Sequence, residues 1–332
     1  MSEEGRVWVL ADPRAGTAAQ ALGVAERLGR PFRVIPLEWG PLARLPLPWP
    51  SLLGLTGAAR DGLRRAALEG PWSGVPSFTI PRIVPEWPAL VIGAGRRSAP
   101  VSRWLRRRGA RTVHLMRPGA GAEDFDLLVI GRHDRPDRAP NVLPILGATH
   151  RISPAVLAVA GESRPDLAAL LRPRVAVLLG GAVRGEGMDP AEAVAIIDRV
   201  LPHAGSVLAT TSRRTGPAAA DAVAARLFGV PGLLHRWGGE GPNPYAAFLA
   251  LADAVVVTGD SVSMLSEALA TSAPVFVAGA PPGAPRHLAL REGLFAAGQA
   301  APFENFPHAP PRAPLDESGR VAALIQERFL DG

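Results

Sequence analysis

The sequence predicts an α/β protein with two Rossmann-like domains, each built on a parallel sheet. Short apolar or β-branched runs alternate with longer segments of helical spacing along most of the 332 residues. This alternation is typical of βαβ units. It pauses between about residues 141 and 173, where Pro and Gly are frequent. Because the length suits two domains of ordinary size, we expect two Rossmann-like halves that face each other across a ligand cleft.

The interruption and the last helical segment define the expected domain boundaries. We expect an N-terminal domain over residues 1–152, a linking helix over 153–173 and a C-terminal domain over 174–310. The stretch 303–314 is Pro-rich and has no period, and 318–329 has helical spacing. Residues 311–332 are therefore expected to form a final helix that can pack back on the N-terminal domain.

The individual elements follow from the period of their apolar residues. In the N-terminal half we expect strands over 7–10, 32–37, 89–92, 112–115 and 127–130, and helices over 17–28, 58–68 and 98–108. In the C-terminal half we expect strands over 175–179, 206–211, 254–258 and 275–278, and helices over 190–201, 216–228, 244–251 and 262–271.

The composition excludes several kinds of chemistry. The chain has no Cys, which excludes disulfides, a thiolate nucleophile and Cys-ligated metal. All 36 basic residues are Arg, so neither a Lys Schiff base nor a P-loop Lys is available. The net charge of +6 permits acidic ligands or an anionic membrane surface. Because the Arg clusters are scattered and lack interleaved aromatic residues, we expect no nucleic-acid partner.

Two features predict a cytoplasmic protein. No apolar run reaches the length of about 18 residues that a transmembrane helix needs. The N-terminus, residues 1–10, is acidic and unlike a signal peptide. The segment 102–109 is a basic helix end with one Trp, which is a candidate for peripheral contact with anionic lipid at the inner face of the membrane. The alternative is a cationic helix end that complements the helix dipole.

The stretch 254–274 carries the strongest signal for a binding site. A β-branched strand ends at Thr258, and Gly259, Asp260 and Ser261 lead into a helix that has Asp260 or Ser261 as its N-cap. A helix start at this edge of a sheet suits a phosphate, and Ser263 lies in the first turn. Glu267, about two turns in on the same face, could accept hydrogen bonds from a ribose diol. The alternative is an ordinary capped helix with Glu267 as a solvated charge.

Two further loops are expected at the same sheet edge. Gly180 and Gly181 follow one strand, and closely spaced glycines allow backbone N–H groups to approach a phosphate. Ser212, Arg213 and Arg214 follow the next strand and suit a diphosphate. The alternatives are a flexible Gly-rich turn and a solvated Arg pair. The Gly-rich segment 238–245 ends in Tyr245, the only Tyr of the chain, which we expect to pack at the helix start.

The N-terminal half offers candidates for acid/base chemistry. His133 and Asp134 follow the strand 127–130, and Asp12 follows the first strand. A surface His-Asp pair in a turn is the alternative interpretation of the first two. The segments that contain Gly16, and Gly95 with Arg96, each lead from a strand into a helix.

Six segments together resemble the mitochondrial-fission family of the plant elongated-mitochondria protein, which has many bacterial members. They are DPRAGTAAQALGVAERLG, GAGRRSAP, FDLLVIGRHD with NVLPILGATH, LLGG, TSRRT and NPYAAFLALADAVVVTGDSVSMLSEALATSAPV. The resemblance covers nearly the whole chain in order. The chain departs from the family pattern at Pro13, where members usually have Gly, and at Thr17, where they have His or Asn.

The family is similar to GT-B glycosyltransferases, so the resemblance implies a GT-B fold. The segment 259–267 resembles the donor helix of the peptidoglycan N-acetylglucosaminyltransferase, which implies ribose binding by Glu267 and a diphosphate near Ser261 and Ser263. Gly16, Gly95 and Arg96 would then belong to the acceptor-side loops. Plant relatives recruit a dynamin-like protein to mitochondria, which is a role without catalysis.

These observations leave two hypotheses for function. The first is glycosyl transfer from a nucleotide sugar of UDP type or similar, with no resident cofactor and no metal, because no D-x-D-like acidic pair stands at a strand end. The catalytic residues are not identified, and Asp12, His133 and Asp134 are weak candidates. The second is a scaffold without catalysis that recruits a protein partner, with or without a bound nucleotide.

Overall fold

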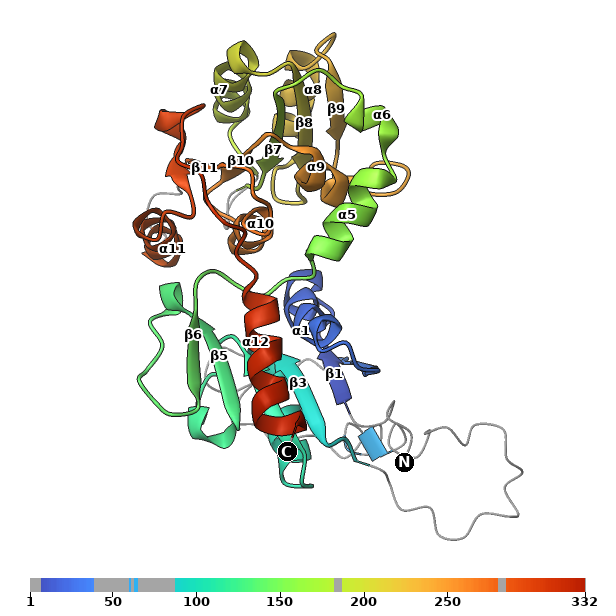
Figure 1. Cartoon of the computed structure of the whole chain (residues 1–332), viewed down its shortest axis with the longest axis vertical. Helices are drawn as coiled ribbons and strands as arrows, with labels where there is room; N and C mark the ends of the chain where they lie inside the picture. Colours follow the sequence, from blue (N-terminus) through green and yellow to red (C-terminus); the bar gives the residue numbers. More distant parts are fainter. Residues whose placement is uncertain are drawn as a thin grey trace, which may run out of the picture. The chain divides into compact units, whose positions relative to one another are not determined.

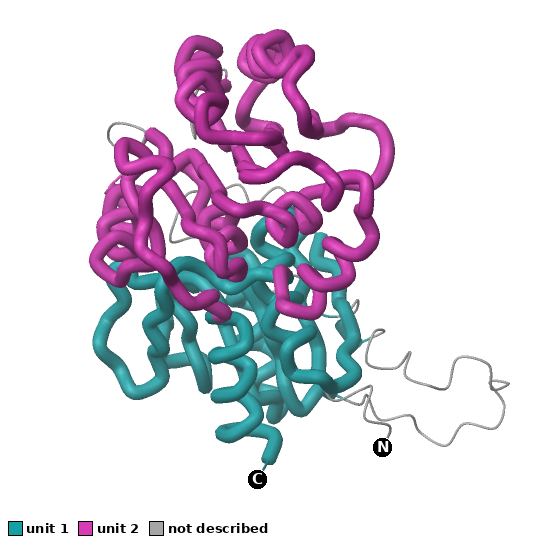
Figure 2. Tube along the Cα trace, turned by 45° about the horizontal axis from the view of Figure 1, so that its top comes forward, with its two compact units in different colours: residues 1–151, 317–332 teal, residues 152–316 magenta. Residues whose placement is uncertain are grey.

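The chain divides into two compact units (Figure 2). The computed structural model describes residues 7–38, 60, 63–64, 87–181, 187–279 and 285–331. Unit 1 takes the described residues of Met1–Arg151 and Glu317–Gly332, and unit 2 is Ile152–Asp316. Most of the helix expected over 58–68 lies outside the described residues.

Unit 1 is a parallel six-stranded sheet in the order β2-β1-β3-β4-β5-β6. The strands are β1 (Val7–Ala11), β2 (Arg33–Pro36), β3 (Leu90–Ala94), β4 (Arg111–Leu115), β5 (Leu127–Gly131) and β6 (Val142–Ile145). Its α-helices are α1 (Ala15–Arg27), α4 (Gly95–Arg106) and α12 (Glu317–Ile325).

The two faces of this sheet are covered by different helices, because successive strand residues point to opposite sides. Val7 and Val9 of β1 pack in a cluster with residues of α1 and α12. Trp8 and Leu10 pack on the other side, in a cluster that includes Trp104 of α4. These four of the five β1 side chains are buried, as expected for a parallel strand with both faces covered.

Helix α12 is the last α-helix of the chain, yet it packs against the sheet of unit 1 (Figure 1). The Glu317 carboxylate accepts a hydrogen bond from the Leu146 N–H at 2.7 Å. The Ser318 hydroxyl accepts from the His150 N–H at 2.8 Å and donates to the His150 carbonyl at 2.8 Å. Directly after α12, the Gln326 amide donates to the Leu28 carbonyl at 3.0 Å. The chain therefore returns to complete the core of unit 1.

Unit 2 is a second parallel six-stranded sheet, in the order β12-β11-β10-β7-β8-β9. Its strands are β7 (Arg174–Leu179), β8 (Ser206–Thr211), β9 (Gly232–His235), β10 (Ala254–Thr258), β11 (Val275–Ala278) and β12 (Ala301–Pro302). Its α-helices are α5 (Pro154–Glu162), α6 (Pro165–Ala168), α7 (Pro190–Val200), α8 (Pro217–Arg226), α9 (Tyr245–Leu251), α10 (Val262–Ala268) and α11 (Pro285–Ala296).

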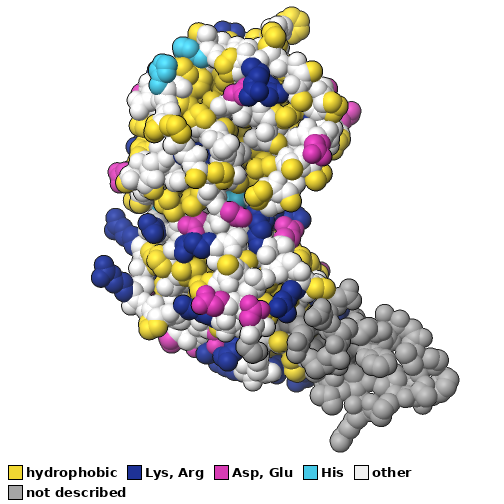
Figure 3. Space-filling model, viewed as in Figure 1, with side chains coloured by type: hydrophobic (Ala, Val, Ile, Leu, Met, Phe, Trp, Pro, Cys, Tyr) yellow, Lys and Arg dark blue, Asp and Glu magenta, His cyan; other side chains and the backbone are white. Residues whose placement is uncertain are grey.

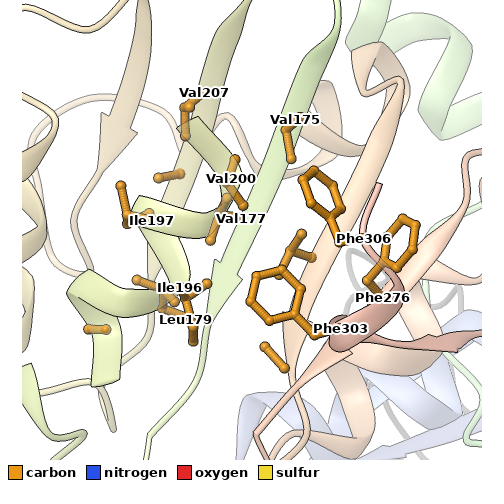
Figure 4. Close-up of a cluster of buried hydrophobic side chains, with 14 of the residues drawn as sticks. Val175, Val177, Leu179, Ile196, Ile197, Val200, Val207, Phe276, Phe303 and Phe306 are labelled. Carbon is orange, nitrogen blue, oxygen red and sulfur yellow. The ribbon is translucent and has the colours of Figure 1, made fainter. Parts of the chain in front are cut away.

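The core of unit 2 is aliphatic at its centre and aromatic at one side (Figure 4). Val175 and Val177 of β7 lie in this cluster with Ile197 of α7. Phe276 and Phe306 meet edge to face, with ring centroids 5.1 Å apart. A separate cluster that includes Leu208, Phe248 and Leu167 packs α6 and α9 against β8.

The structure confirms the predicted fold class, which is two Rossmann-like domains with parallel sheets. The sequence did not predict β6, β9, β12 or α11. The three strands all lie at sheet edges, where they are short and partly exposed, so their pattern is weak. In place of one helix over 153–173 the chain forms α5 and α6, and Pro165 begins the second of them. None of the described helices is both long enough and apolar enough to span a membrane.

The buried His114 of β4 predicts a loss of stability at acid pH. Its ring lies against Phe125, with centroids 4.6 Å apart, and its Nε2 is 3.1 Å from the Gly95 carbonyl. Burial lowers the pKa of His114 to about 3. In the unfolded chain the pKa of His114 is near 6.5, so between about pH 6.5 and pH 3 His114 is protonated in the unfolded chain but not in the folded one. The free energy of unfolding therefore decreases as pH falls through this range, by about 1.4 kcal/mol per pH unit.

We therefore expect the melting temperature to fall between pH 7 and pH 4, and His114→Phe to reduce that slope while it keeps an aromatic ring beside Phe125. Calorimetric melting of both proteins across this range is the measurement. Equal slopes in the two proteins would show that His114 does not cause the loss.

Candidate functional site

The order of strands in unit 2 brings the ends of β7 and β10 together. The chain leaves β7 for β8 on one side, and it later leaves β10 for β11 on the other side. In open parallel sheets, the crevice at such a reversal lies outside the carboxyl ends of the strands and is the usual place for a ligand. Gly180 and Gly181 follow β7 at this point, and Gly259 and Asp260 follow β10.

Two hydrogen bonds join the ends of β7 and β10. The Thr258 hydroxyl accepts from the Gly180 N–H at 2.7 Å, and the Asp260 carboxylate accepts from the Gly181 N–H at 2.8 Å. A Cβ on Gly180 would overlap the Asp260 carboxylate, and a Cβ on Gly181 would overlap the Arg214 carbonyl. The glycines are therefore required for the close approach of three loops.

The loop after β8 joins the same cluster through its hydroxyl groups. Ser212 donates to the Gly180 carbonyl at 3.1 Å. Thr215 donates to the Leu179 carbonyl at 2.8 Å and accepts from the Ser212 N–H at 2.8 Å. The loops that the sequence placed at one sheet edge are thus hydrogen-bonded to one another.

The two neighbouring arginines of this loop differ in their surroundings. Arg214 forms an ion pair with the buried Asp260 carboxylate, with Nη2 and Oδ2 3.2 Å apart, so its charge is balanced within the cluster. Arg213 is exposed and forms no ion pair with any residue that the structure describes. The two arginines were predicted to act alike, but only Arg214 is paired with Asp260, and Arg213 is exposed.

The start of α10 settles which residue is the N-cap. Ser261 is the cap, and its hydroxyl accepts from the Met264 N–H at 3.4 Å. This bond uses one acceptor position of the Ser261 hydroxyl, whose O–H is still a donor. Ser263 lies in the first turn of α10 and is partly exposed, and its hydroxyl forms no hydrogen bond with any described residue.

The alternative interpretation of Glu267 was a solvated charge on an ordinary capped helix. In the structure its side chain is instead hydrogen-bonded to another helix. Its Oε2 accepts a hydrogen bond from the Tyr245 hydroxyl at 2.7 Å. Burial raises the pKa of the Glu267 carboxyl to about 7, and the hydrogen bond from Tyr245 opposes this rise. Burial, together with the Glu267 charge, raises the pKa of Tyr245 well above its usual value.

Sequence analysis missed the role of Tyr245, which was expected only to pack at the start of α9. Its N–H is held at 3.1 Å by the Asn243 side chain, and its hydroxyl reaches α10. The one available signal was its position directly after a Gly-rich loop. Its contact with Glu267 depends on how α9 and α10 lie in space, which no local pattern encodes.

Unit 1 has a comparable reversal between β1 and β3. The Asp12 carboxylate is buried and accepts from the Arg14 N–H at 2.8 Å, which shapes the turn into α1. Gly95 has φ +77°, and a Cβ there would be 3.2 Å from the Thr17 side chain. The loops after β1 and β3 are therefore adjacent. Gly16 and Arg96 are both exposed, in the first turns of α1 and α4.

His133 and Asp134 lie in a 3₁₀ turn, Arg132–Asp134, after β5. His133 Nε2 is 3.8 Å from Asp134 Oδ2, and the His133 side chain is only 2% exposed. The alternative of a surface His-Asp pair is therefore wrong for His133, which is buried. Within the part of the chain that the structure describes, no group of three or more His, Asp or Glu side chains could hold a metal ion.

The buried carboxylate of Glu267 predicts that removing its charge stabilises the protein at alkaline pH. The folded pKa of about 7 lies above the ordinary 4.5, so the stability that the neutral carboxyl provides below pH 4.5 is lost as pH rises to about 7. Glu267→Gln cannot ionise and can still accept from Tyr245. Relative to wild type, we expect it to gain on the order of 1 to 3 kcal/mol between pH 4.5 and pH 8.

Denaturant unfolding at the two pH values measures this gain. Glu162→Gln, at an exposed position of α5, is the matched control and should follow wild type. A Glu267→Gln curve parallel to wild type at both pH values would contradict the prediction.

Comparison with known proteins places the chain in a family. The model of the family described as mitochondrial fission ELM1 matches residues 15–329. Mitochondrial fission protein ELM1 of Arabidopsis thaliana is 31% identical over 242 residues, which is 64% of this chain and 56% of that protein. The chain thus spans little more than half the length of this relative. The uncharacterised protein RP120 of Rickettsia prowazekii is 22% identical over 309 residues, 82% of each chain.

Solved structures share the fold at low sequence identity. UDP-GlcNAc 2-epimerase from Neisseria meningitidis, bound to UDP-GlcNAc, has a TM-score of 0.54 and 11% identity over 98% of this chain and 100% of that one. UDP-GlcNAc 2-epimerase from Methanocaldococcus jannaschii has a TM-score of 0.51 and 12% identity over 98% and 93%. These likenesses concern the fold alone. By its sequence over nearly its whole length, the chain belongs to the mitochondrial fission ELM1 family.

Proposed function

We propose that the carboxyl edge of the unit 2 sheet binds a nucleotide sugar, and that the protein transfers the sugar to an acceptor held by unit 1 without a metal ion. The proposal is supported by the cluster of loops after β7, β8 and β10 at the reversal of the sheet. It is also supported by the fold, since a solved protein of the same fold is bound to UDP-GlcNAc.

Glu267 is the observation that carries the proposal. Its Oε2 is occupied by the Tyr245 hydroxyl, and its Oε1 has no hydrogen-bond partner among the described residues. Glu267 is partly exposed, so Oε1 is accessible and can accept hydrogen bonds from the donors of a ligand. A ribose diol has two adjacent hydroxyl donors of the right kind.

The surrounding loops provide positive groups for a diphosphate. Arg213 is an exposed guanidinium, which matches the geometry of phosphate oxygens. The N–H groups of Gly180 and Gly181 are already donated to Thr258 and Asp260, so these glycines hold the loops together and do not themselves bind the diphosphate. The Asp260 charge is balanced by Arg214, so it does not repel an anion at full strength. As the sugar leaves, fixed positive groups would stabilise the charge that develops on the diphosphate.

The acceptor side of the reaction is assigned to unit 1, around Gly16, Gly95 and Arg96. Asp12, His133 and Asp134 remain the candidates for the base that removes the acceptor's proton. Asp12 lies directly after β1, beside the turn that carries Gly16, and is the best placed of the three relative to these loops.

A second candidate function is supported by family membership. The Arabidopsis relative is named a mitochondrial fission protein, and the match covers 56% of it. On this alternative, the chain is a scaffold that recruits a protein partner, and the Glu267 site is a remnant or a regulatory nucleotide site.

Thermal melting with a panel of UDP-, GDP-, TDP- and CMP-sugars separates these functions. We expect one nucleotide to raise the melting temperature by on the order of 5 °C at saturating concentration, because it binds only the folded state. Arg213→Gln should abolish the shift, and Arg226→Gln, a surface arginine of α8, should leave it intact. Arg214 is unsuitable as a test because its loss would expose the buried Asp260 charge. If no nucleotide shifts the melt at millimolar concentration, the scaffold function is favoured.

The pKa of Glu267 adds a pH dependence to nucleotide binding. The ionised carboxylate accepts from a ribose diol better than the neutral acid, so the affinity should rise as pH passes upward through about 7. In Glu267→Gln we expect weaker binding with a flat profile over pH 6 to 8. Calorimetric titration at several pH values measures both. A wild-type profile as flat as that of the variant would remove Glu267 from the ribose site.

A further inference from the structure

Unit 1 contains a recess that has no part in the proposed nucleotide site. Its volume is about 370 Å³, and it is lined by the last turn of α4, the turn through Gly109 and the start of β4. Because it lies where β4 begins, it is at the amino edge of the sheet, away from the Gly95 loop. It includes part of the basic segment 102–109. On the face shown in Figure 3, basic side chains gather mainly over unit 1, in the lower part of the view.

Four arginines and two aspartates line this recess: Arg103, Arg106, Arg107, Arg111, Asp124 and Asp126. Arg103 pairs with Asp124 at 2.8 Å. Arg106 and Arg111 both pair with Asp126, at 3.5 Å and 3.4 Å. Four guanidinium groups against two carboxylates leave an excess of two positive charges.

Asp126 keeps its negative charge because it is held in place. It accepts from the Thr112 N–H at 2.8 Å and from the Thr112 hydroxyl at 3.0 Å. Burial alone would raise the pKa of Asp126, but these hydrogen bonds and the Arg106 charge outweigh it and lower the pKa. Asp126 therefore stays ionised near neutral pH, and the excess of two positive charges in the recess stays the same.

Arg107 is the residue with unused binding capacity. It is exposed, and it forms neither an ion pair nor a side-chain hydrogen bond within the described ranges. Its neighbour Arg108 is turned elsewhere, since its guanidinium lies 3.3 Å from the Trp104 ring centroid and donates to the Trp104 carbonyl. The dipole at the end of α4 explains why Arg103, Arg106 and Arg107 are favoured there, but it does not explain the fourth cation, Arg111, at the start of β4.

We propose that this recess binds a ligand through a phosphate monoester. Such a group carries a charge of about −1.5 to −2 at neutral pH, which matches the cationic excess. Guanidinium groups bind phosphate oxygens in pairs of parallel hydrogen bonds, and Arg106 and Arg107 are both exposed and adjacent at the end of α4. The recess is of the size of ordinary small-molecule sites, so it has room for more than the phosphate itself.

Calorimetric titration of the full chain with glycerol 3-phosphate tests the site, with glycerol as the probe that lacks phosphate. We expect glycerol 3-phosphate to bind and glycerol not to bind. Arg107→Gln should weaken binding about tenfold, and Arg106→Gln/Arg107→Gln more than that, because each variant removes charge-assisted hydrogen bonds. Arg138→Gln/Arg328→Gln removes two exposed arginines of unit 1 outside the recess and should bind like wild type.

A second arm distinguishes a soluble ligand from a lipid headgroup. Co-sedimentation with phosphatidylcholine vesicles, with or without phosphatidic acid, uses the same four proteins. Binding only to vesicles that contain phosphatidic acid, lost in the double recess variant, would support the site with lipid as its source. The proposal is overturned if wild type binds neither glycerol 3-phosphate nor vesicles that contain phosphatidic acid. It is also overturned if the recess variants and the control variant bind equally well. Because Arg213 and Glu267 are intact in every variant, this outcome is independent of the nucleotide-sugar test.

Discussion

The Asp260 carboxylate joins three loops at the carboxyl edge of the unit 2 sheet. It accepts from the backbone of Gly181 and pairs with Arg214, and through them it links the ends of β10, β7 and β8. A buried charge is stable only when it is paired and hydrogen-bonded, so these loops must lie close together. The absence of a Cβ at Gly180 and Gly181 makes that approach sterically possible. The arrangement of every other group at this edge follows from this contact.

Glu267 shows the cost of placing a carboxylate where it is desolvated. Its environment disfavours ionisation, and among the described residues only the Tyr245 hydroxyl compensates. Groups whose pKa is shifted by burial, and which lie near a sheet reversal, are typical of binding sites. The Asp260 carboxylate has both a hydrogen-bond donor and a cation as partners within the protein. Glu267 has a partner for Oε2 only, among the described residues. This difference separates the residue that organises the loops from the residue that we propose meets the ligand.

Unit 1 depends on the end of the chain. Helix α12 covers the same face of the sheet as α1, and its first residues bind backbone groups near Leu146 and His150. Val321 and Ile325 of this helix are fully buried. The core of unit 1 is therefore incomplete until the whole chain has been made, and the two ends of the sequence are structurally interdependent.

Sequence alone determined the fold class and the central strands, because parallel strands covered on both faces are apolar runs such as those of β7 and β10. It also placed Gly180, Ser212 and Asp260 at one sheet edge, since the ends of successive parallel strands must meet there. The edge strands β6, β9 and β12 gave no comparable signal. Tertiary structure alone decided that Arg214 is neutralised while Arg213 is exposed, and that Tyr245 holds Glu267. These outcomes depend on contacts between residues distant in sequence, and a hydrophobic period reports only which face of its own element is buried.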